Sequence, residues 1–230
     1  MVFGGWFIAL CVGKFFILQY KLISKPHMKI IGIGKNYVSD LSEMPSEKGM
    51  PVIFTKPESS ILKSGETLHL PKVSNEVWYE IELAFRIGKT CKSVSSEEAI
   101  DYIEGLTLAN DLTAKDVLAA SRESKGPWAL AKGFDGATPL GEFVSMDGFQ
   151  DLANINFTLE INGEVLQTGH SSLMIYSLGE VVEVVSSFMT LEPGDVILTG
   201  TPAKGVGLVK SGDHMVAFLE GVKTLETVVT

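Results

Sequence analysis

The segment WYEIELAFRIG, residues 78–88, constrains the fold because it has the alternating pattern of a β-strand and yet carries two glutamates. Successive side chains of a strand point to opposite faces. One face of this strand is therefore wholly apolar and consists of Tyr79, Ile81, Leu83, Phe85 and Ile87. Glu80 and Glu82 lie on the other face, with Cα atoms about 6.5–7 Å apart. At that spacing both carboxylates stay ionised only if they are exposed to water or face a cation.

Strand patterns dominate the rest of the chain as well. They fall at residues 29–33, 52–55, 78–88, 155–161, 195–199 and 214–219. The turn sequences KSGE, INGE, EPGD and KSGD separate them. These strands do not alternate regularly with helices, which argues against a doubly wound parallel sheet. The pattern predicts a mixed α+β fold that is mostly β, mostly antiparallel, with helices at its periphery.

Helix signals are fewer, and the clearest lie at residues 95–105, 113–126 and 177–189. Each begins with a pair of residues at the spacing of an N-terminal cap, and these pairs are Ser95 with Glu98, Thr113 with Asp116 and Ser177 with Glu180. Gly126 is the expected end of the middle helix. No repeat or long linker interrupts this arrangement, so we expect one domain over residues 28–230.

Composition restricts the partners of the protein. The 230 residues include 19 Lys and Arg against 28 Asp and Glu, which gives a net charge of −9. Such a charge repels phosphate backbones and disfavours nucleic acid or an anionic membrane as the main partner. Cys11 and Cys91 make neither a disulfide framework nor a zinc site, which favours a reducing, cytoplasmic location.

Residues 1–27 are more apolar than anything that follows and fit no targeting class. Lys14 interrupts the apolar run, so a membrane-spanning helix is disfavoured. Three interpretations remain open: a weak membrane anchor, an added amphipathic element, or a start site set too far upstream, with Met28 as the alternative start. We expect this extension to lie outside the catalytic fold.

Two glycine-containing segments resemble phosphate-binding motifs but lack required residues. GIGKNY follows a strand yet has no third glycine of a dinucleotide fingerprint. GTPAKGVG has Val206 and Gly207 where a phosphate loop needs Lys and Ser or Thr. The second loop could still offer backbone N–H groups and the Thr201 hydroxyl to a carboxylate, or it could be an ordinary tight turn.

A third carboxylate follows the two glutamates, at Asp111 in the segment LANDLTAKD. Three carboxylates without sulfur suit Mg²⁺ or Mn²⁺, and such a site leaves positions for water and substrate oxygens. The alternative for Glu80 and Glu82 is a strand face that is simply exposed to solvent.

Several motifs together resemble the fumarylacetoacetate hydrolase family. They are GIGKNY, FTKP, EIEL, NDLTAKD, PWALAKGFD, NGEVLQ and GDVILTGTPAKGVG, in family order and spacing. The similarity covers residues 29 to about 229 and is strongest to the short branch of acylpyruvases, oxaloacetate decarboxylases and 2-hydroxyhepta-2,4-diene-1,7-dioate isomerases. It implies a mixed β-roll or β-sandwich fold and usually a homodimer.

The resemblance also implies a function and a metal. In that family Glu80, Glu82 and Asp111 would hold Mg²⁺ or Mn²⁺. The substrates would be small 2-oxo, 2,4-dioxo or 2-hydroxy-diene acids, transformed through a metal-stabilised enolate by C–C hydrolysis, decarboxylation or isomerisation. The alternative is a non-catalytic metabolite-binding or scaffold protein that keeps the metal site.

Five further positions match family residues near the substrate. By this match Lys132 is a catalytic lysine, and its apolar surroundings in PWALAK disfavour a surface lysine. Lys56 and Thr201 resemble carboxylate-binding contacts. Gln167 resembles a substrate contact, with an exposed strand end as its alternative, and Tyr37 does too, with a packing aromatic as its alternative.

One departure from the family concerns the activation of water. Hydrolytic members carry R-N-Y-x-x-H-x-x-E, whereas this chain reads KNYVSDLSE. Lys35 replaces the arginine as the expected substrate contact, Asp40 replaces the histidine, and Glu43 is retained. Asp40 and Glu43 could polarise water as a carboxylate pair, or they could cap a lid. The missing histidine favours decarboxylation or isomerisation, which need no activated water.

Overall fold

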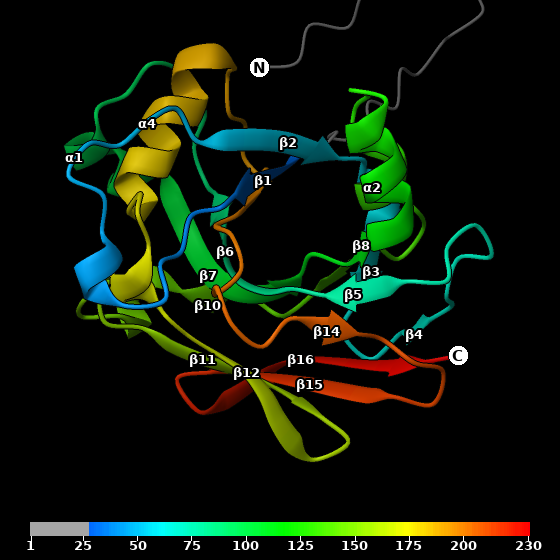
Figure 1. Cartoon of the computed structure of the whole chain (residues 1–230). Coiled ribbons are helices and arrows are strands. Elements are labelled where there is room, and N and C mark those ends of the chain that lie inside the picture. The colour runs from blue at the N-terminus through cyan, green and yellow to red at the C-terminus, as the bar shows by residue number, and fades with distance from the viewer. Residues whose placement is uncertain (1–27) are drawn as a thin grey trace, which may run out of the picture.

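Two curved layers of β-sheet face each other in the computed structural model, which describes residues 28–230 (Figure 1). The upper layer is an eight-stranded sheet with the order β2-β1-β13-β6-β7-β9-β3, and β10 also pairs with β7. Its strands are β1 (Ile30–Gly34), β2 (Val52–Lys56), β3 (Ile61–Lys63), β6 (Ile81–Ile87), β7 (Ile103–Asn110), β9 (Thr138–Leu140), β10 (Val144–Ser145) and β13 (Val196–Leu198). The apolar extension at 1–27, with its three interpretations, lies outside the described residues.

The lower layer is a five-stranded sheet with the order β12-β11-β15-β16-β4. It contains β4 (Thr67–Leu68), β11 (Asn156–Ile161), β12 (Glu164–His170), β15 (His214–Leu219) and β16 (Val222–Val229). A small third sheet joins β14 (Gly207–Leu208), β5 (Val77–Tyr79) and β8 (Thr113–Ala114). Most strand pairs are antiparallel, as expected, and β1 with β13, β3 with β9 and β4 with β16 are parallel.

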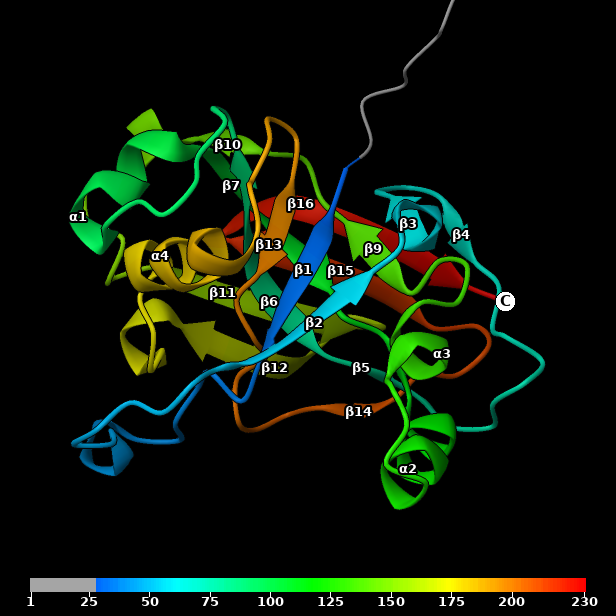
Figure 2. The same cartoon turned by 90° about the horizontal axis from the view of Figure 1, so that it is seen from above.

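The helices lie at two opposite sides of the sheets, as Figure 2 shows. On one side are α1 (Ser96–Ala99) and α4 (Leu178–Phe188), and on the other are α2 (Lys115–Glu123) and α3 (Ala129–Lys132). Single turns of 3₁₀ helix complete the structure at η1 (Leu41–Glu43), η2 (Glu58–Ser60), η3 (Ile100–Tyr102), η4 (Met146–Gly148) and η5 (Ser171–Leu173). The expected mixed α+β architecture is confirmed. Within residues 28–230, none of the helices combines the length and the apolar character needed to cross a membrane.

The main core fills the space between the two layers. Ile81, Leu83 and Phe85, from the apolar face of β6, are fully buried there with Phe157 and Leu159 of β11. The other face of β6 is buried too, because Ala84 packs into a second apolar cluster with Ile30, Ala109, Val196 and Leu198. A solvent-exposed strand face for Glu80 and Glu82 is therefore wrong, since these residues are only 8% and 3% exposed.

The predicted turns are confirmed by backbone conformation. A glycine with positive φ lies in each of the four turn sequences, and these are Gly65, Gly163, Gly194 and Gly212. In INGE, Asn162 and Gly163 have φ values of 54° and 83° and connect β11 to β12. Both central residues of a type I′ hairpin turn need positive φ, and Asn-Gly tolerates it best.

Two of the three predicted helix caps are confirmed. Ser95 with Glu98 and Ser177 with Glu180 form reciprocal capping boxes at α1 and α4. Thr113 is wrong as a cap, because it lies in β8 and its hydroxyl donates to the Asp111 carbonyl (3.2 Å). The middle helix begins instead at Lys115, directly after that strand.

The first predicted helix is shorter than expected. It gives way to η3 and ends at Tyr102, where β7 begins. The residues of β7, together with those of β12 and β16, were not among the strands expected from the sequence. β7 is the central partner of β6, so tertiary pairing here outweighs the local helical pattern.

The contact between α1 and α4 predicts an unusual effect of adding a methyl group. A Cβ at Gly179 would lie 2.4 Å from the Ser96 carbonyl oxygen. Glycine to alanine in a helix normally stabilises by about 1 kcal/mol, but crowding against backbone costs about 1–3 kcal/mol. We expect Gly179→Ala to lower the melting temperature, whereas Ser187→Ala, on the exposed side of α4, should leave it nearly unchanged. A rise in melting temperature for Gly179→Ala would contradict this packing.

Candidate metal centre

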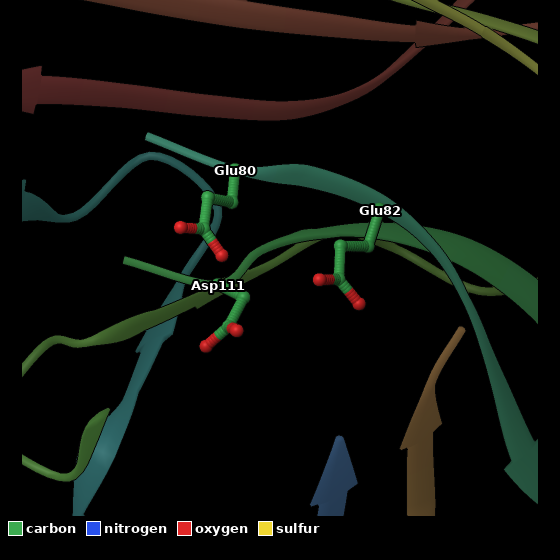
Figure 3. Close-up of side chains that lie close together, drawn as sticks. All are labelled: Glu80, Glu82 and Asp111. Atoms are coloured by element: carbon green, nitrogen blue, oxygen red, sulfur yellow. The ribbon is translucent and has the colours of Figure 1, made fainter. Parts of the chain in front are cut away.

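Three carboxylates meet where β6 and β7 pair. Ile81 lies opposite Asn110, so Glu80 is opposite Asp111, whose N–H donates to the Glu80 carbonyl (2.8 Å). Residues opposite each other in an antiparallel pair share a face, and Glu82 is two residues from Glu80 on the same face. Figure 3 shows the three side chains projecting to one side of the two strands. One oxygen from each carboxylate lies within 4.8 Å of the others.

Three lysines surround these carboxylates. The Lys132 ammonium group donates to Glu80 (3.0 Å) and to Asp111. Lys115 donates to the other oxygen of Glu80. Lys56 donates to Asp111 (2.5 Å) and to the Ala137 carbonyl (2.6 Å). The charges of the three carboxylates and the three ammonium groups thus nearly cancel, and this compensation allows them to be buried together.

The three carboxylates do not share the lysines equally. Within residues 28–230, Glu82 accepts the backbone N–H of Gly200 (2.7 Å) but takes part in no salt bridge. Burial raises the pKa of Glu82 well above its usual range, and the neighbouring Asp111 raises it further. Burial acts in the same direction on Asp111, but Lys132 and Lys56 outweigh it and hold the pKa of Asp111 below its usual value. Glu82 is the carboxylate that most lacks a cation.

The lysines respond in opposite ways to this environment. Burial opposes the charge of Lys132, yet Asp111 and Glu80 more than offset it and raise its pKa. Burial lowers the pKa of Lys56, and although Asp111 raises it, repulsion from Lys132 lowers it further, so the pKa stays below its usual value. Lys132 is therefore a firmly protonated group at the base of the site. The all-oxygen donor set, the short distances and the unpaired Glu82 fit a hard divalent cation such as Mg²⁺ or Mn²⁺.

The glycine-rich loop after β13 holds the two glutamates in place. Gly200 has a φ of 99°, and a Cβ there would lie 2.8 Å from the Ile33 carbonyl oxygen, so only glycine brings this N–H to Glu82. The next hydroxyl, that of Thr201, donates to the carbonyl of Ile81 (3.0 Å). The expected N–H donor to a carboxylate is present, and its acceptor is the protein's own Glu82.

Gln167 of β12 completes this support. Its carbonyl oxygen accepts the N–H of Ile81 (3.0 Å), and its amide group donates to the Thr201 hydroxyl (2.7 Å). The side chain is buried, so an exposed strand end is wrong. Gln167 thereby fixes the residue that lies between Glu80 and Glu82.

A cavity of about 340 Å³ opens above the carboxylates. Of the residues predicted from the sequence, seven line it, and these are Glu80, Glu82, Asp111, Lys132, Thr201, Tyr37 and Lys35. Tyr37 is largely buried, with its hydroxyl 3.5 Å from that of Thr199, and burial raises its pKa. Lys56 and Gln167 lie behind this wall and contact the site residues instead of the cavity.

Asp40 and Glu43 are not among the lining residues in the described part of the chain. Asp40 is the N-cap of the single turn η1, Glu43 is the last residue of that turn, and both are exposed. Asp40 accepts hydrogen bonds from the N–H (2.9 Å) and hydroxyl (2.6 Å) of Ser42, and Glu43 accepts the N–H of Ser39 (3.0 Å). The bonds from Ser42 lower the pKa of Asp40. Both carboxylates cap the turn that carries them.

Comparison with known proteins assigns the chain to a family. Residues 29–230 match the family model described as fumarylacetoacetate (FAA) hydrolase C-terminal. The chain belongs to the fumarylacetoacetate hydrolase family.

Relatives in this family are named for different reactions. The mitochondrial oxaloacetate tautomerase of Bos taurus is 40% identical over 201 residues, which cover 86% of this chain and 89% of that one. The 5-carboxymethyl-2-hydroxymuconate delta-isomerase of Mycobacterium smegmatis superimposes with a TM-score of 0.81 at 39% identity, covering 89% and 79% of the chains. A fumarylpyruvate hydrolase from Pseudomonas aeruginosa, in complex with Mn²⁺ and pyruvate, gives 0.79 at 30% identity, covering 89% and 91%.

Sequence reasoning missed part of this fumarylacetoacetate hydrolase site. Lys115 pairs with Glu80. This lysine could have been predicted from its position in the sequence, four residues after Asp111 at the start of α2. The apolar and basic walls were also missed, and they include Phe54, Leu118, Arg122, Trp128 and Val206. These residues come from separate segments, and only the tertiary fold brings them together.

The unequal pairing of the carboxylates predicts opposite effects of two isosteric changes. Asp111→Asn leaves buried Lys56 and Lys132 short of a partner and should destabilise the metal-free protein by about 3–5 kcal/mol. Glu82→Gln removes a charge that burial disfavours and should leave stability unchanged or raised. Urea unfolding with a chelator present measures both. Equal destabilisation by the two substitutions would contradict the assigned pairing.

Proposed function

We propose that the protein is a divalent-metal-dependent enzyme that acts on small 2-oxo acids. The observation that carries this proposal is the set of three buried carboxylates where β6 begins and β7 ends, at the base of a cavity and beside the protonated Lys132. Glu80, Glu82 and Asp111 would hold Mg²⁺ or Mn²⁺. When bound, the metal supplies a Lewis acid that stabilises negative charge on carboxylate and 2-oxo oxygens.

The residues of this chain contribute binding and charge stabilisation around that centre. Lys132 provides a buried ammonium group that can bind an anionic oxygen of the substrate. Lys115 adds a second ammonium group on the cavity wall, and its charge lies 5.5 Å from the centre of the Trp78 ring. Phe54 and Trp128 pack against each other and form an apolar part of the cavity wall.

The named relatives support this substrate class. Their reactions on oxaloacetate, on a hydroxymuconate and on fumarylpyruvate all involve carbon atoms next to an oxo or enol group. A metal site that stabilises an enolate serves each of these reactions.

Among these reactions we favour decarboxylation and isomerisation over hydrolysis. Hydrolysis needs a base that activates water. Asp40 replaces the family histidine, is exposed, and has a lowered pKa because Ser42 donates two hydrogen bonds to it. A carboxylate stabilised in its charged form is a weak base, so Asp40 is poorly suited to that role.

The proposal is tested by assaying metal-free protein, with Mg²⁺ or Mn²⁺ added back, against oxaloacetate, an acylpyruvate and a 2-hydroxy-diene dioate. Turnover should depend on the metal and should fall about a hundredfold or more in Glu82→Gln, because charge stabilisation by the metal is lost. Reactions with metal alone give the background. Binding of these acids without turnover of any would support a non-catalytic protein instead.

Asp40→Asn separates the reaction types. Asparagine caps a turn as aspartate does, so the structure of η1 should persist. Decarboxylation and isomerisation should be nearly unchanged in this variant. A loss of about 10²- to 10⁴-fold in acylpyruvate cleavage, the usual contribution of a general base, would identify Asp40 as that base and favour hydrolysis.

A further inference from the structure

The cavity has a second region that the metal centre does not use. Away from the three carboxylates its wall is apolar, formed by Phe54, Leu118, Trp128 and Val206. Beyond the base, the charged lining residues within 28–230 are Lys35 and Arg122, and both are positive. This basic opening contrasts with the overall charge of −9.

One face of α2 connects the two regions. Lys115, Leu118 and Arg122 are spaced i, i+3 and i+7, so they lie along one side of the helix. Lys115 donates to Glu80 at the base, and Leu118 is buried in the wall. Arg122 lies two turns beyond Lys115, about 10 Å along the helix axis.

Arg122 is held in position by an aromatic side chain. Its guanidinium lies 5.1 Å from the centre of the Trp128 ring, and this ring packs against Phe54 with centroids 5.7 Å apart. Stacking leaves the N–H groups of a guanidinium free for two parallel bonds to a carboxylate. Lys35 follows β1 and provides a second cation on the cavity wall.

Charge balance favours a second anionic group on the ligand. Three carboxylates and three ammonium groups at the base cancel before a metal binds. A divalent cation therefore leaves the base with excess positive charge, and Lys35 and Arg122 add to it. A ligand with one carboxylate neutralises only part of this excess.

We propose, on the basis of the proposed function, that Arg122 binds the distal carboxylate of an elongated 2-oxo diacid, with Lys35 assisting. The apolar wall between the two ends suits an unbranched carbon chain. At roughly 1.2 Å per bond of extended chain, a seven-carbon diacid spans about 7 Å between its carboxyl carbons. The side chains of Lys115 at the base and Arg122 at the far end cover the rest of the distance between the two ends of the cavity. A five-carbon diacid spans only about 5 Å and does not reach Arg122.

The test measures binding to the Mn²⁺-loaded protein by titration calorimetry. The probes are 2-oxoheptanedioate, 2-oxoheptanoate and 2-oxoglutarate. They lack the 4-oxo group that C–C hydrolysis requires and the carboxylate on C3 that decarboxylation removes, so they should bind without being cleaved. The variants are Arg122→Gln and, as a matched control, Arg86→Gln. Arg86 is the other arginine of the sequence, and it pairs with Glu104 away from the cavity.

We expect the native protein to bind 2-oxoheptanedioate about tenfold more tightly than 2-oxoheptanoate, the gain of one charge-assisted contact. Arg122→Gln should remove this preference and should change the affinity for 2-oxoglutarate by no more than about twofold. Arg86→Gln should keep the preference for 2-oxoheptanedioate. The preference should also shrink at high salt.

Three results would overturn the inference. Equal binding of the two seven-carbon acids by the native protein, or equal loss for all three acids in Arg122→Gln, would show that Arg122 reads no distal carboxylate and would leave the proposed function standing. Binding of none of the acids by metal-loaded protein would overturn the proposed function and the inference together.

Discussion

The burial of three carboxylates and three ammonium groups in one place is the constraint on which the site depends. Each of these ions alone would be expensive to remove from water. Lys132 links Glu80 to Asp111, and Lys56 pairs with Asp111 from behind, so most of the charge is compensated within the protein. Glu82 is the exception, because it is buried and takes part in no salt bridge within residues 28–230.

The surrounding fold serves this charge cluster. The pairing of β6 with β7 sets Asp111 opposite Glu80, and the small Ala109 opposite Glu82 leaves space beside that side chain. The loop at Gly200 and the amide of Gln167 fix the strand that carries both glutamates. The apolar face of the same strand is packed in the main core, so Glu82 and the adjacent Glu80 extend from a strand whose opposite face is fully buried.

Local sequence signals account for the parts of this structure that depend on one segment. The alternation in residues 78–88, the INGE hairpin and the capping boxes at Ser95 and Ser177 were all predictable. β7 was not, because its pairing with β6 decides its conformation. In the site, the i, i+2 glutamate pair and the family motifs predicted a cluster of three carboxylates, and Glu80, Glu82 and Asp111 do lie together. Lys115 and Arg122 were missed because their place in the cavity wall depends on which face α2 turns to the cavity.

We expect one divalent cation to bind to oxygens of Glu80, Glu82 and Asp111. Without the cation, two of these residues, Glu80 and Asp111, accept hydrogen bonds from Lys132. Anomalous diffraction from a crystal soaked in Mn²⁺ tests it most directly. A single strong manganese peak is expected in contact with all three carboxylates, with the Lys132 ammonium group no longer between Glu80 and Asp111. Manganese bound elsewhere, or an unchanged Lys132 bridge at saturating Mn²⁺, would contradict it.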